Sequence, residues 1–294
     1  MSVIDILNVT LPTFITIFIG YIFGKAVKID MSGVVDIVYY VGLPALVFVS
    51  ILDHPFTLLD AVKVWISVVA VTAGCLAVAW ILFKILKTRH TGLYLPISLP
   101  NTVNIPFPII SLAYGPSGLF AATLYYIPNV FLIYSLGVFV AAGGKWQHNL
   151  MEMLKIPAIY AAILALVLNL SHITVPGVIF NSLDFIGGMV TPAVVLILGY
   201  SLSKVKITSL PTTILASLIR MGIGLALGFL MADLFHMTGV LRSVVILVSA
   251  MPAAVNTYMV AEKYKSESEL VASVVLVTTI ISLFSIPVLL KVLG

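Results

Sequence analysis

Two motifs of polar residues interrupt long apolar stretches of this sequence. In each motif, a proline is followed four residues later by an asparagine, with small or polar residues between them. Side-chain amides and hydroxyls can bind a carboxylate without placing a fixed charge in a low-dielectric interior. The motifs therefore predict a binding site for an organic anion that comprises these residues: Pro100, Asn101, Thr102, Asn104, Pro252, Asn256 and Thr257.

The first motif lies within LPNTVNIPFP, residues 99–108, which contains three prolines. A proline removes a backbone donor and disfavours the helical conformation in the residue before it, so we expect extended backbone at Leu99, Ile105 and Phe107. Non-helical backbone inside a bilayer persists only where protein or a water-filled cavity satisfies its polar groups. The motif thus predicts a discontinuous helix, and Pro252 predicts a second, milder break.

The ends of two broken helices would supply the chemistry of this site. A helix N-terminus offers free N–H groups and about half a positive charge, which favours an anion, whereas the carbonyl groups at a C-terminus can hold a cation or water. Each asparagine can alternatively cap the break in its own helix, and capping is compatible with ligand binding. The two motifs therefore predict an anion held by neutral donors.

Composition assigns the chain to the membrane. Hydrophobic residues make up 61% of the chain and charged residues 9%, with a mean hydropathy of +1.20, whereas about a quarter of the residues in soluble domains are charged. A helix needs about 20 apolar residues to span a bilayer, and the short alternating segments of a β-barrel do not occur here. We expect ten spans, at about residues 3–24, 31–51, 59–84, 91–114, 117–141, 156–170, 177–202, 209–234, 239–261 and 269–291.

The basic residues predict the orientation of these spans. With the N-terminus outside, only Lys63, Arg242 and Lys291 would lie outside. The inner loops would then carry Lys25, Lys28, Lys84, Lys87, Arg89, Lys145, Lys155, Lys204, Lys206, Lys263 and Lys265. The positive-inside rule therefore places both termini on the extracytoplasmic face of the cell membrane. Because these charges are dispersed and lack interleaved aromatic residues, they do not form a nucleic-acid-binding patch.

The two halves of the sequence share a pattern of prolines. VDIVYYVGLPALV in the second span matches LDFIGGMVTPAVV in the seventh, and SLPNTVN matches SAMPAAVN. Because each half holds five spans, an odd number, the second half must cross the membrane in the opposite sense. Prolines outside the two motifs are interpreted as kinks in ordinary helices: Pro12, Pro44, Pro128, Pro157, Pro192 and Pro287.

The predicted fold is an all-α integral membrane protein of ten transmembrane helices. Residues 1–142 form the first five-helix repeat and residues 156–294 form the second, inverted one. A short cytoplasmic linker at residues 143–155 joins them. The broken helices, the fourth and the ninth, would cross at the membrane centre, as expected for a secondary transporter built from inverted repeats.

The same motifs resemble a known family. LPNT, with Pro108 eight residues after Pro100, is similar to the fourth-helix motif of the auxin efflux carrier family, which includes the plant PIN carriers. The ninth and tenth helices of prokaryotic members resemble MPAAVNTYMVAEKY and ELVASVVLVTTIISLFSIPVLL, and LPALVF in the second span is also similar. The likeness extends over essentially the whole chain.

This resemblance implies a homodimeric carrier of small organic anions, such as auxin-like or dicarboxylate compounds, that works by an elevator mechanism. Helices one, two, six and seven would form a scaffold, and helices three, four, five, eight, nine and ten would form the moving transport domain. The family's carboxylate-binding asparagine corresponds to Asn101. Plant carriers have an acid and a lysine on the third helix without counterparts here, and Ser67 falls near the position of the acid.

Other charged residues in the apolar segments have more than one interpretation. Arg220, in the middle of the eighth span, either attracts anions or pairs with an acid. Asp36 and Asp184 lie near span ends, where a structural role is favoured. Glu262 follows Pro252 by ten residues, or about 15 Å along a helix, which suggests a place at the mouth of the site. A proton relay is not expected, because these histidines lie in loops or at span ends: His54, His90, His148, His172 and His236.

Transport is favoured over two other classes of function. An intramembrane enzyme is not supported, because Asp36 and Asp184 lack the sequence context of aspartyl proteases and no HExxH motif is present. A channel or receptor is also weaker, since a channel needs a continuous polar pore lining. We expect a secondary active transporter that is not an enzyme and uses no cofactor or metal. Its partners would be a small carboxylate, the lipid bilayer and a second copy of the chain.

Overall fold

The fold is all-helical across the part of the chain that the structure, a computed structural model, describes: residues 1–54, 57–87, 90–142 and 155–294. In these residues no strand forms, and the only extended pairing is one isolated bridge. The predicted linker at residues 143–155 lies outside the described residues except for Lys155, and so do Arg89 and His148.

The helices coincide with the predicted spans to within a few residues at their ends. In the first half they are α1 (Val3–Ala26), α2 (Ser32–Ile37), η1 (Val38–Gly42), α3 (Leu43–Leu52), α4 (Leu58–Leu86), η2 (Thr91–Leu93), α5 (Tyr94–Ser98), α6 (Pro106–Leu132), η3 (Ile133–Gly137) and α7 (Val138–Ala141). In the second half they are α9 (Pro157–Leu170), α10 (Gly177–Gly187), α11 (Val190–Leu202), α12 (Leu210–Leu234), α13 (Gly239–Ser249), α14 (Val255–Lys263) and α15 (Ser268–Leu293).

The lengths and apolar composition of these helices confirm the integral membrane class. Among the described residues, 7 helical runs are long and apolar enough to cross a bilayer, and α9 and α13 are shorter apolar helices. One of the 7 runs, Pro106–Ala141, contains a break. Gly115 within it has φ 62° and ψ −153°, a conformation that is almost restricted to glycine. Residues 106–114 and 116–132 are therefore two helical segments, as the fourth and fifth spans predict.

Prolines occupy equivalent places in the two halves. Pro44 lies in the first turn of α3, directly after the π-helical turn η1. Pro192 lies in the first turn of α11, after the interruption at residues 188–189. Both prolines thus follow an irregular turn inside a helical run that otherwise continues, Ser32–Leu52 in one half and Gly177–Leu202 in the other. The predicted kink at Pro157 is wrong, since Pro157 is the first residue of α9, where an N–H group has no intrahelical partner.

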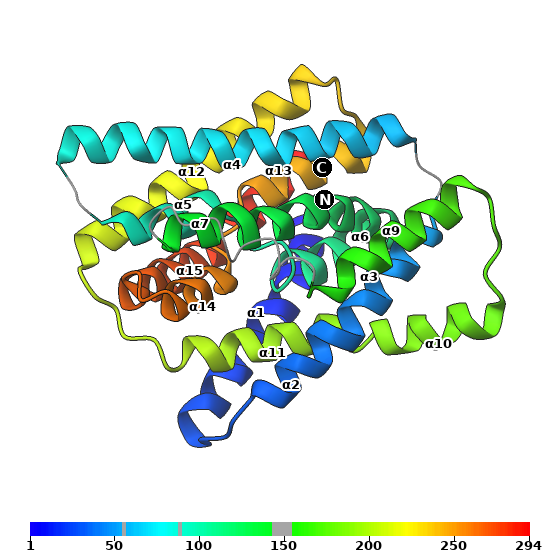
Figure 1. Cartoon of the computed structure of the whole chain (residues 1–294), viewed down its shortest axis with the longest axis horizontal. Helices are drawn as coiled ribbons and strands as arrows, with labels where there is room; N and C mark the ends of the chain where they lie inside the picture. The colour runs from blue at the N-terminus through cyan, green and yellow to red at the C-terminus, as the bar shows by residue number, and fades with distance from the viewer. Residues whose placement is uncertain (55–56, 88–89, 143–154) are drawn as a thin grey trace.

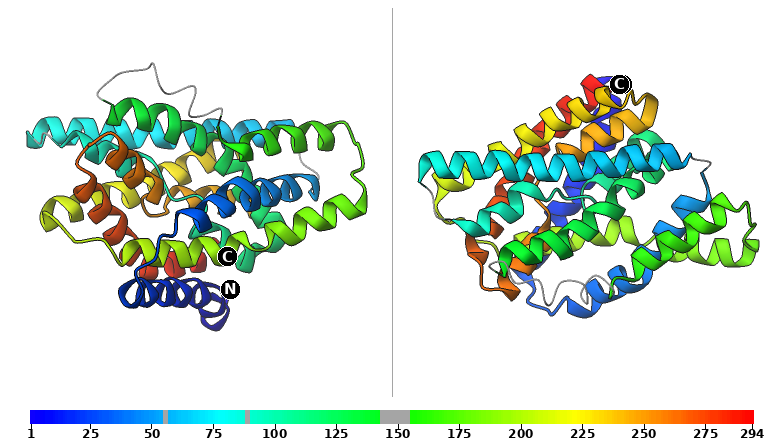
Figure 2. Two further views of the ribbon diagram at one scale, coloured as in Figure 1. Left: turned by 60° about the horizontal axis from the view of Figure 1, so that its bottom comes forward. Right: turned by 45° about the horizontal axis from the view of Figure 1, so that its top comes forward.

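The helices pack into two groups. In the first group, α1 packs against α11, and α3 packs against α9 and α10; Figure 2 (left) shows α1, in dark blue, beside α11, in yellow-green. In the second group, α4 packs against α12, which also contacts α13 and α15; in Figure 1, α4 runs across the top beside α12. Contacts between the groups come mainly from α6 and α15 against α1 and α3.

Two glycines allow the close approach of α1 and α11. A Cβ atom added at Gly199 would lie 2.0 Å from the carbonyl oxygen of Ile17, and one added at Gly20 would lie 2.3 Å from that of Leu196. Small residues are the usual means by which membrane helices bring their backbones together. The backbones of α1 and α11 therefore pack directly against each other.

The two ends of the chain meet. The amino group of Met1 donates a hydrogen bond to the carbonyl oxygen of Gly294, 3.2 Å away, and Figure 1 shows the termini next to each other. Both termini therefore lie on one side of the molecule, which is the arrangement that an even number of spans requires.

Candidate functional site

The two broken helices meet inside the molecule. The first break separates α5, which ends at Ser98, from α6, and the second separates α13, which ends at Ser249, from α14. Pro100 and Ala253, one from each break, form an antiparallel bridge. Asn101 donates its backbone N–H to the Pro252 carbonyl at 2.7 Å, and Ala254 donates to the Leu99 carbonyl at 3.0 Å. The two breaks thus satisfy part of each other's backbone, which makes non-helical chain tolerable at this depth.

The bridge uses prolines where no N–H group is needed. Its two hydrogen bonds flank the Pro100–Ala253 pair, so neither Pro100 nor Pro252 has to donate. The remaining donor, the N–H of Ala253, bonds to the hydroxyl of Thr278 on α15 at 3.1 Å. We did not predict this role for Thr278, whose only sequence signal is a hydroxyl in the middle of an apolar span.

The predicted extended backbone is confirmed at one of its three positions. Leu99 has φ −109° and ψ 106°. Ile105, with φ −104° and ψ −46°, is helical, and Phe107 lies within α6, so these two predictions are wrong. The reason is that Pro106 and Pro108 fall in the first turn of α6, where the missing N–H groups have no intrahelical partner.

Asn101 both closes a turn and keeps one donor free. Its side chain is 3% exposed, and its Oδ1 atom accepts hydrogen bonds from the N–H groups of Val103 at 3.3 Å and Asn104 at 2.9 Å. Its Nδ2 atom is buried and has no partner among the described residues. An unsatisfied buried donor costs about 1–3 kcal/mol. A ligand with a hydrogen-bond acceptor, such as a carboxylate oxygen, could accept from this Nδ2 atom.

Free backbone donors come from α14 rather than from α6. In the first turn of α6, Pro106 and Pro108 have no N–H group, and Phe107 donates to the carbonyl of Val103 at 3.1 Å. At the start of α14, no described residue accepts from the N–H groups of Val255 and Asn256. The α6 N-terminus therefore offers fewer donors than the sequence predicts, and the α14 N-terminus keeps two.

The other predicted site residues are divided between the bridge and its surroundings. The hydroxyl of Thr102 accepts a hydrogen bond from Asn129 on α6 at 3.1 Å, and Asn129 also donates to the Pro100 carbonyl at 3.4 Å. Thr257 turns its hydroxyl back to the carbonyl of Ala254 at 2.5 Å, which secures the first turn of α14. Sequence reasoning missed Asn129, although its position after a proline in an apolar span was a usable signal.

A cavity of about 200 Å³ lies beside the broken helices. Asp36 and Tyr39, on α2 and η1, come from the helix that continues into α3 of the first group. Tyr126, Tyr134 and Asn256 come from α6, η3 and α14, which pack with the second group. The hydroxyl of Tyr39 donates to the Oδ1 atom of Asn104 at 3.4 Å, which links the cavity to the first break. Tyr39 and Tyr134 both belong to π-helical turns, η1 and η3, a distortion that is frequent at functional sites. Asp36 therefore faces a cavity, whereas Asp184 lines none of those described.

Arg220 lies at the C-terminal ends of both broken helices. Its guanidinium group donates to the carbonyls of Ile97 at 3.1 Å and Ser98 at 3.2 Å, at the end of α5, and to the carbonyl of Ser249, at the end of α13. Its side chain is 0% exposed. No acidic side chain pairs with it in the described ranges. The interpretation that Arg220 pairs with an acid is therefore wrong for this part of the chain.

The other residues singled out in the sequence lie away from the two breaks themselves. Glu262 borders a separate cavity beside His90 and Glu267, whose side chains are 2.5 Å apart. Ser67 donates to the carbonyl of Lys63 within its own helix. His54, His172 and His236 follow the ends of helices, as the sequence predicts.

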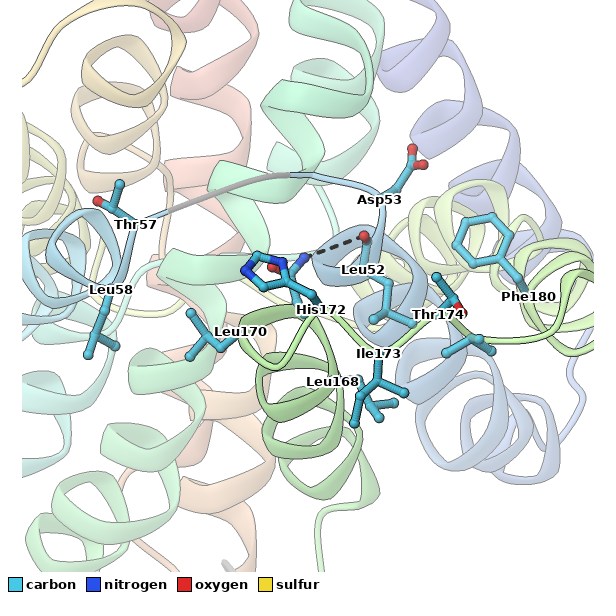
Figure 3. Close-up of a pocket in the computed structure, with 12 residues that line it drawn as sticks. Leu52, Asp53, Thr57, Leu58, Leu168, Leu170, His172, Ile173, Thr174 and Phe180 are labelled. Atoms are coloured by element: carbon cyan, nitrogen blue, oxygen red, sulfur yellow. Dashed lines mark hydrogen bonds between the residues drawn. The ribbon is translucent and has the colours of Figure 1, made fainter.

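A larger cavity, of about 730 Å³, lies where α3 and α9 end and α10 begins (Figure 3). Leu52, Asp53 and His172 are among the residues that line it. The dashed line in Figure 3 is the hydrogen bond from the amide of Asn169 to the carbonyl of Leu52, 3.4 Å long. None of the predicted site residues borders this cavity, so we assign the candidate site to the broken helices instead.

Paired broken helices with buried polar groups define this protein as a helical membrane protein with an internal polar site. The family model described as "Membrane transport protein" matches residues 5–152 and 146–290. The chain belongs to this family, and the resemblance to auxin efflux carriers is thereby confirmed.

Two curated proteins are similar over nearly their whole length. A protein of Methanocaldococcus jannaschii named as an uncharacterized transporter is 28% identical over 298 residues, covering 95% of this chain and 96% of its own. A second one so named, of Methanothermobacter thermautotrophicus, is 24% identical over 295 residues, covering 94% and 95%. The family and these relatives support membrane transport and give no support to catalysis.

Proposed function

We propose that this protein is a secondary active transporter of small organic anions, with its cargo bound where the two broken helices meet. The observation that carries the proposal is the buried Nδ2 atom of Asn101, which has no partner among the described residues. The free N–H groups of Val255 and Asn256 add donors at the start of α14, where the helix dipole also favours negative charge. An anion held by neutral hydrogen bonds fits this set of groups.

The proposed architecture is ten transmembrane helices in two inverted repeats, residues 1–142 and 156–294. Equivalent interruptions support it, since a helix breaks before α6 in one half and before α14 in the other. The distortions that precede Pro44 and Pro192 are also equivalent. The two segments matched by the family model, 5–152 and 146–290, divide the chain at nearly the same place.

The two packing groups suggest how the cargo would move. The group that contains α1, α3, α9 and α11 corresponds to the proposed scaffold, and the group that contains α4, α12, α13 and α15 corresponds to the proposed transport domain. The cavity beside the broken helices lies between the groups. In the proposed elevator mechanism the second group slides along the first and carries the site across the membrane. The scaffold would also form a homodimer, as the family resemblance implies.

The proposed setting is the cell membrane, with both termini outside. The contact of Met1 with Gly294 supports a common side for the termini, and the positive-inside rule supports the choice of side. For the cargo, the proposal extends to small mono- and dicarboxylates, including auxin-like compounds.

Binding measured by calorimetry on purified protein tests the site. A carboxylate library is first screened for compounds that raise thermal stability, because ligands of the native state do so. A hydrogen bond to a charged group contributes about 1.5–3 kcal/mol, so Asn101→Ala should weaken binding of the selected acid about tenfold to a hundredfold. Asn101→Asp should bind still more weakly, because it opposes like charges. Asn169→Ala, which alters an asparagine outside the site, should bind as the wild type does.

A neutral analogue separates anion recognition from simple capping. The amide of the same acid should bind weakly to the wild type, and Asn101→Ala should discriminate much less between acid and amide. Equal binding of acid and amide by the wild type would contradict the proposal. In proteoliposomes, acceleration of uptake by cargo on the far side would establish a carrier, whereas its absence would favour the channel alternative.

A further inference from the structure

The guanidinium group of Arg220 joins the C-terminal ends of two half-helices that belong to different halves of the chain. One of its terminal nitrogens donates to the carbonyls of Ile97 and Ser98 at the end of α5, and the other donates to the carbonyl of Ser249 at the end of α13. Carbonyl groups at a helix C-terminus have no intrahelical donor and carry about half a negative charge. Two such ends therefore point at one cation.

The charge of Arg220 has no acidic counterpart in the part of the chain that the structure describes. A buried ion normally needs an opposite charge, because removal from water is costly. Here the partial negative charges of the two helix ends take that role, and the side chain is 0% exposed. The group is therefore bound in the way that a desolvated metal cation is bound by backbone carbonyls.

The surrounding backbone is shaped around this group. A Cβ atom added at Gly224 would lie 2.2 Å from the carbonyl oxygen of Ser249 and 2.4 Å from the Nη2 atom of Arg220. A Cβ atom added at Gly228 would lie 2.8 Å from the Cβ atom of Ser249. Arg220, Gly224 and Gly228 therefore share one face of α12. The absence of side chains at the two glycines leaves space for the guanidinium group and for the end of α13.

We infer that the Arg220 guanidinium takes the place of a bound metal cation at the C-terminal ends of α5 and α13. Cargo binding therefore requires no Na⁺ or K⁺ at these carbonyls. Arg220 would act as a positioning residue, because it holds the end of α5, and with it the bridge that begins at Leu99, against the end of α13. The expectation for cargo affinity rests on the proposed anion site. The expectation for the stability of the cargo-free protein in different salts does not depend on that site.

The wild-type protein provides the first test. Its melting temperature, measured without cargo, should be the same in NaCl, KCl and choline chloride of equal ionic strength, and so should its affinity for the selected acid. A melting temperature or an affinity that rises specifically with Na⁺ or K⁺ would overturn the inference. If no acid binds in any salt, the proposed function fails, but the melting temperatures still decide the role of Arg220.

Removal of the guanidinium should create a dependence on added cations. In choline chloride, Arg220→Ala should melt at a lower temperature than the wild type and bind the acid about tenfold more weakly or worse. Sodium ions or millimolar guanidinium should restore part of both losses. Arg242→Ala is the matched control, because Arg242 is partly exposed and pairs with Asp233 at 3.0 Å. This control should show no response to Na⁺ or guanidinium.

Two further variants keep the test decisive if Arg220→Ala does not fold. Arg220→Lys retains the charge, and Arg220→Gln retains a hydrogen-bond donor without the charge. Arg220→Lys should be the more stable of the two, and only Arg220→Gln should respond to added cations. The reverse order of stability, or a folded Arg220→Ala that is unaffected by any salt, would show that Arg220 only fills space.

Discussion

The hydroxyl groups of Ser50 and Thr123 form a hydrogen bond, with 3.3 Å between their oxygen atoms. Ser50 lies on α3, in the proposed scaffold, and Thr123 lies on α6, in the proposed transport domain. Both side chains are buried. The pair therefore reports directly on whether the two helix groups move relative to each other.

A disulfide at this pair should stop transport. Side-chain oxygens 3.3 Å apart leave room for a bond between two sulfur atoms about 2 Å apart. In a Cys75→Ala background, we expect Ser50→Cys with Thr123→Cys to abolish transport in proteoliposomes after oxidation, because the groups can no longer slide. The acid should still bind, and reduction should restore transport.

The matched control is a pair within one group. Thr208 and Ser273 also have hydroxyl oxygens 3.2 Å apart. Ser273 lies on α15, and Thr208 lies just before α12, where its carbonyl accepts from the Thr213 hydroxyl, so both are attached to helices of the proposed transport domain. Oxidation of Thr208→Cys with Ser273→Cys should leave transport near its starting rate. Continued transport by the oxidised Ser50 and Thr123 variant would contradict the elevator mechanism.

Replacement of Thr278 should weaken the bridge between the broken helices. Thr278→Val removes the acceptor of the Ala253 N–H group and leaves that donor buried without a partner. We expect a loss of about 1–3 kcal/mol in the free energy of unfolding, measured by denaturation in detergent, together with weaker binding of the acid.

The neighbouring threonine supplies the comparison. The hydroxyl of Thr279 donates to the carbonyl of Val275 in its own helix, at 2.8 Å. Thr279→Val should therefore cost less, and Thr278→Ser should retain most of the stability. Equal losses for the two valine variants would mean that the bond to Ala253 contributes little.

The backbone break at Gly115 should not tolerate a side chain. Its φ of 62° and ψ of −153° are strained for any other residue, so Gly115→Ala should destabilise the fold by about 1–3 kcal/mol. A Cβ atom at Gly115 would meet nothing within 4 Å, so the cost is conformational rather than steric. Gly222→Ala, in the helix α12 and also in open space, should instead stabilise by about 0.5–1 kcal/mol. Thermal denaturation should therefore show a lower melting temperature than the wild type for Gly115→Ala and a higher one for Gly222→Ala.

Cysteine labelling tests the orientation. In a Cys75→Ala background, Ser2→Cys should react with a membrane-impermeant reagent added outside intact cells, because both termini are expected there. Lys265→Cys, in an expected inner loop between α14 and α15, should react only after permeabilisation. The opposite labelling pattern would contradict the proposed topology and would place every loop on the other side of the membrane.

The positions of the spans and of the two breaks could be predicted, because hydropathy and proline act locally on the backbone. The geometry within the first break could not be predicted in full. Pro106 and Pro108 have the same local effect in a break as in the first turn of a helix, and only the position where α6 begins distinguishes these cases. The shared bridge of Pro100 and Ala253 was foreseen as a crossing but not as a pairing of backbones.

The supporting residues of the site were harder to predict. Thr278 and Asn129 are single polar residues in apolar spans, and their contacts are with residues far away in the sequence. Arg220 was singled out, but an acid was the expected alternative partner, since isolated charges in membranes usually pair. Carbonyl groups at helix C-termini accept from its two terminal nitrogens instead, while its Nε atom has no partner among the described residues, and the ends of α5 and α13 come together only in the folded chain.

The contact between Met1 and Gly294 makes the chain a nearly closed ring. A short linker could join the two ends, and the ring could be reopened between α7 and α9 to give a circular permutant. In that permutant the two halves would be synthesised in reverse order. Because each half is expected to hold an odd number of spans, the new ends would emerge on the opposite face of the bilayer. Recovery of transport by such a chain would show that neither half needs the other to be inserted first.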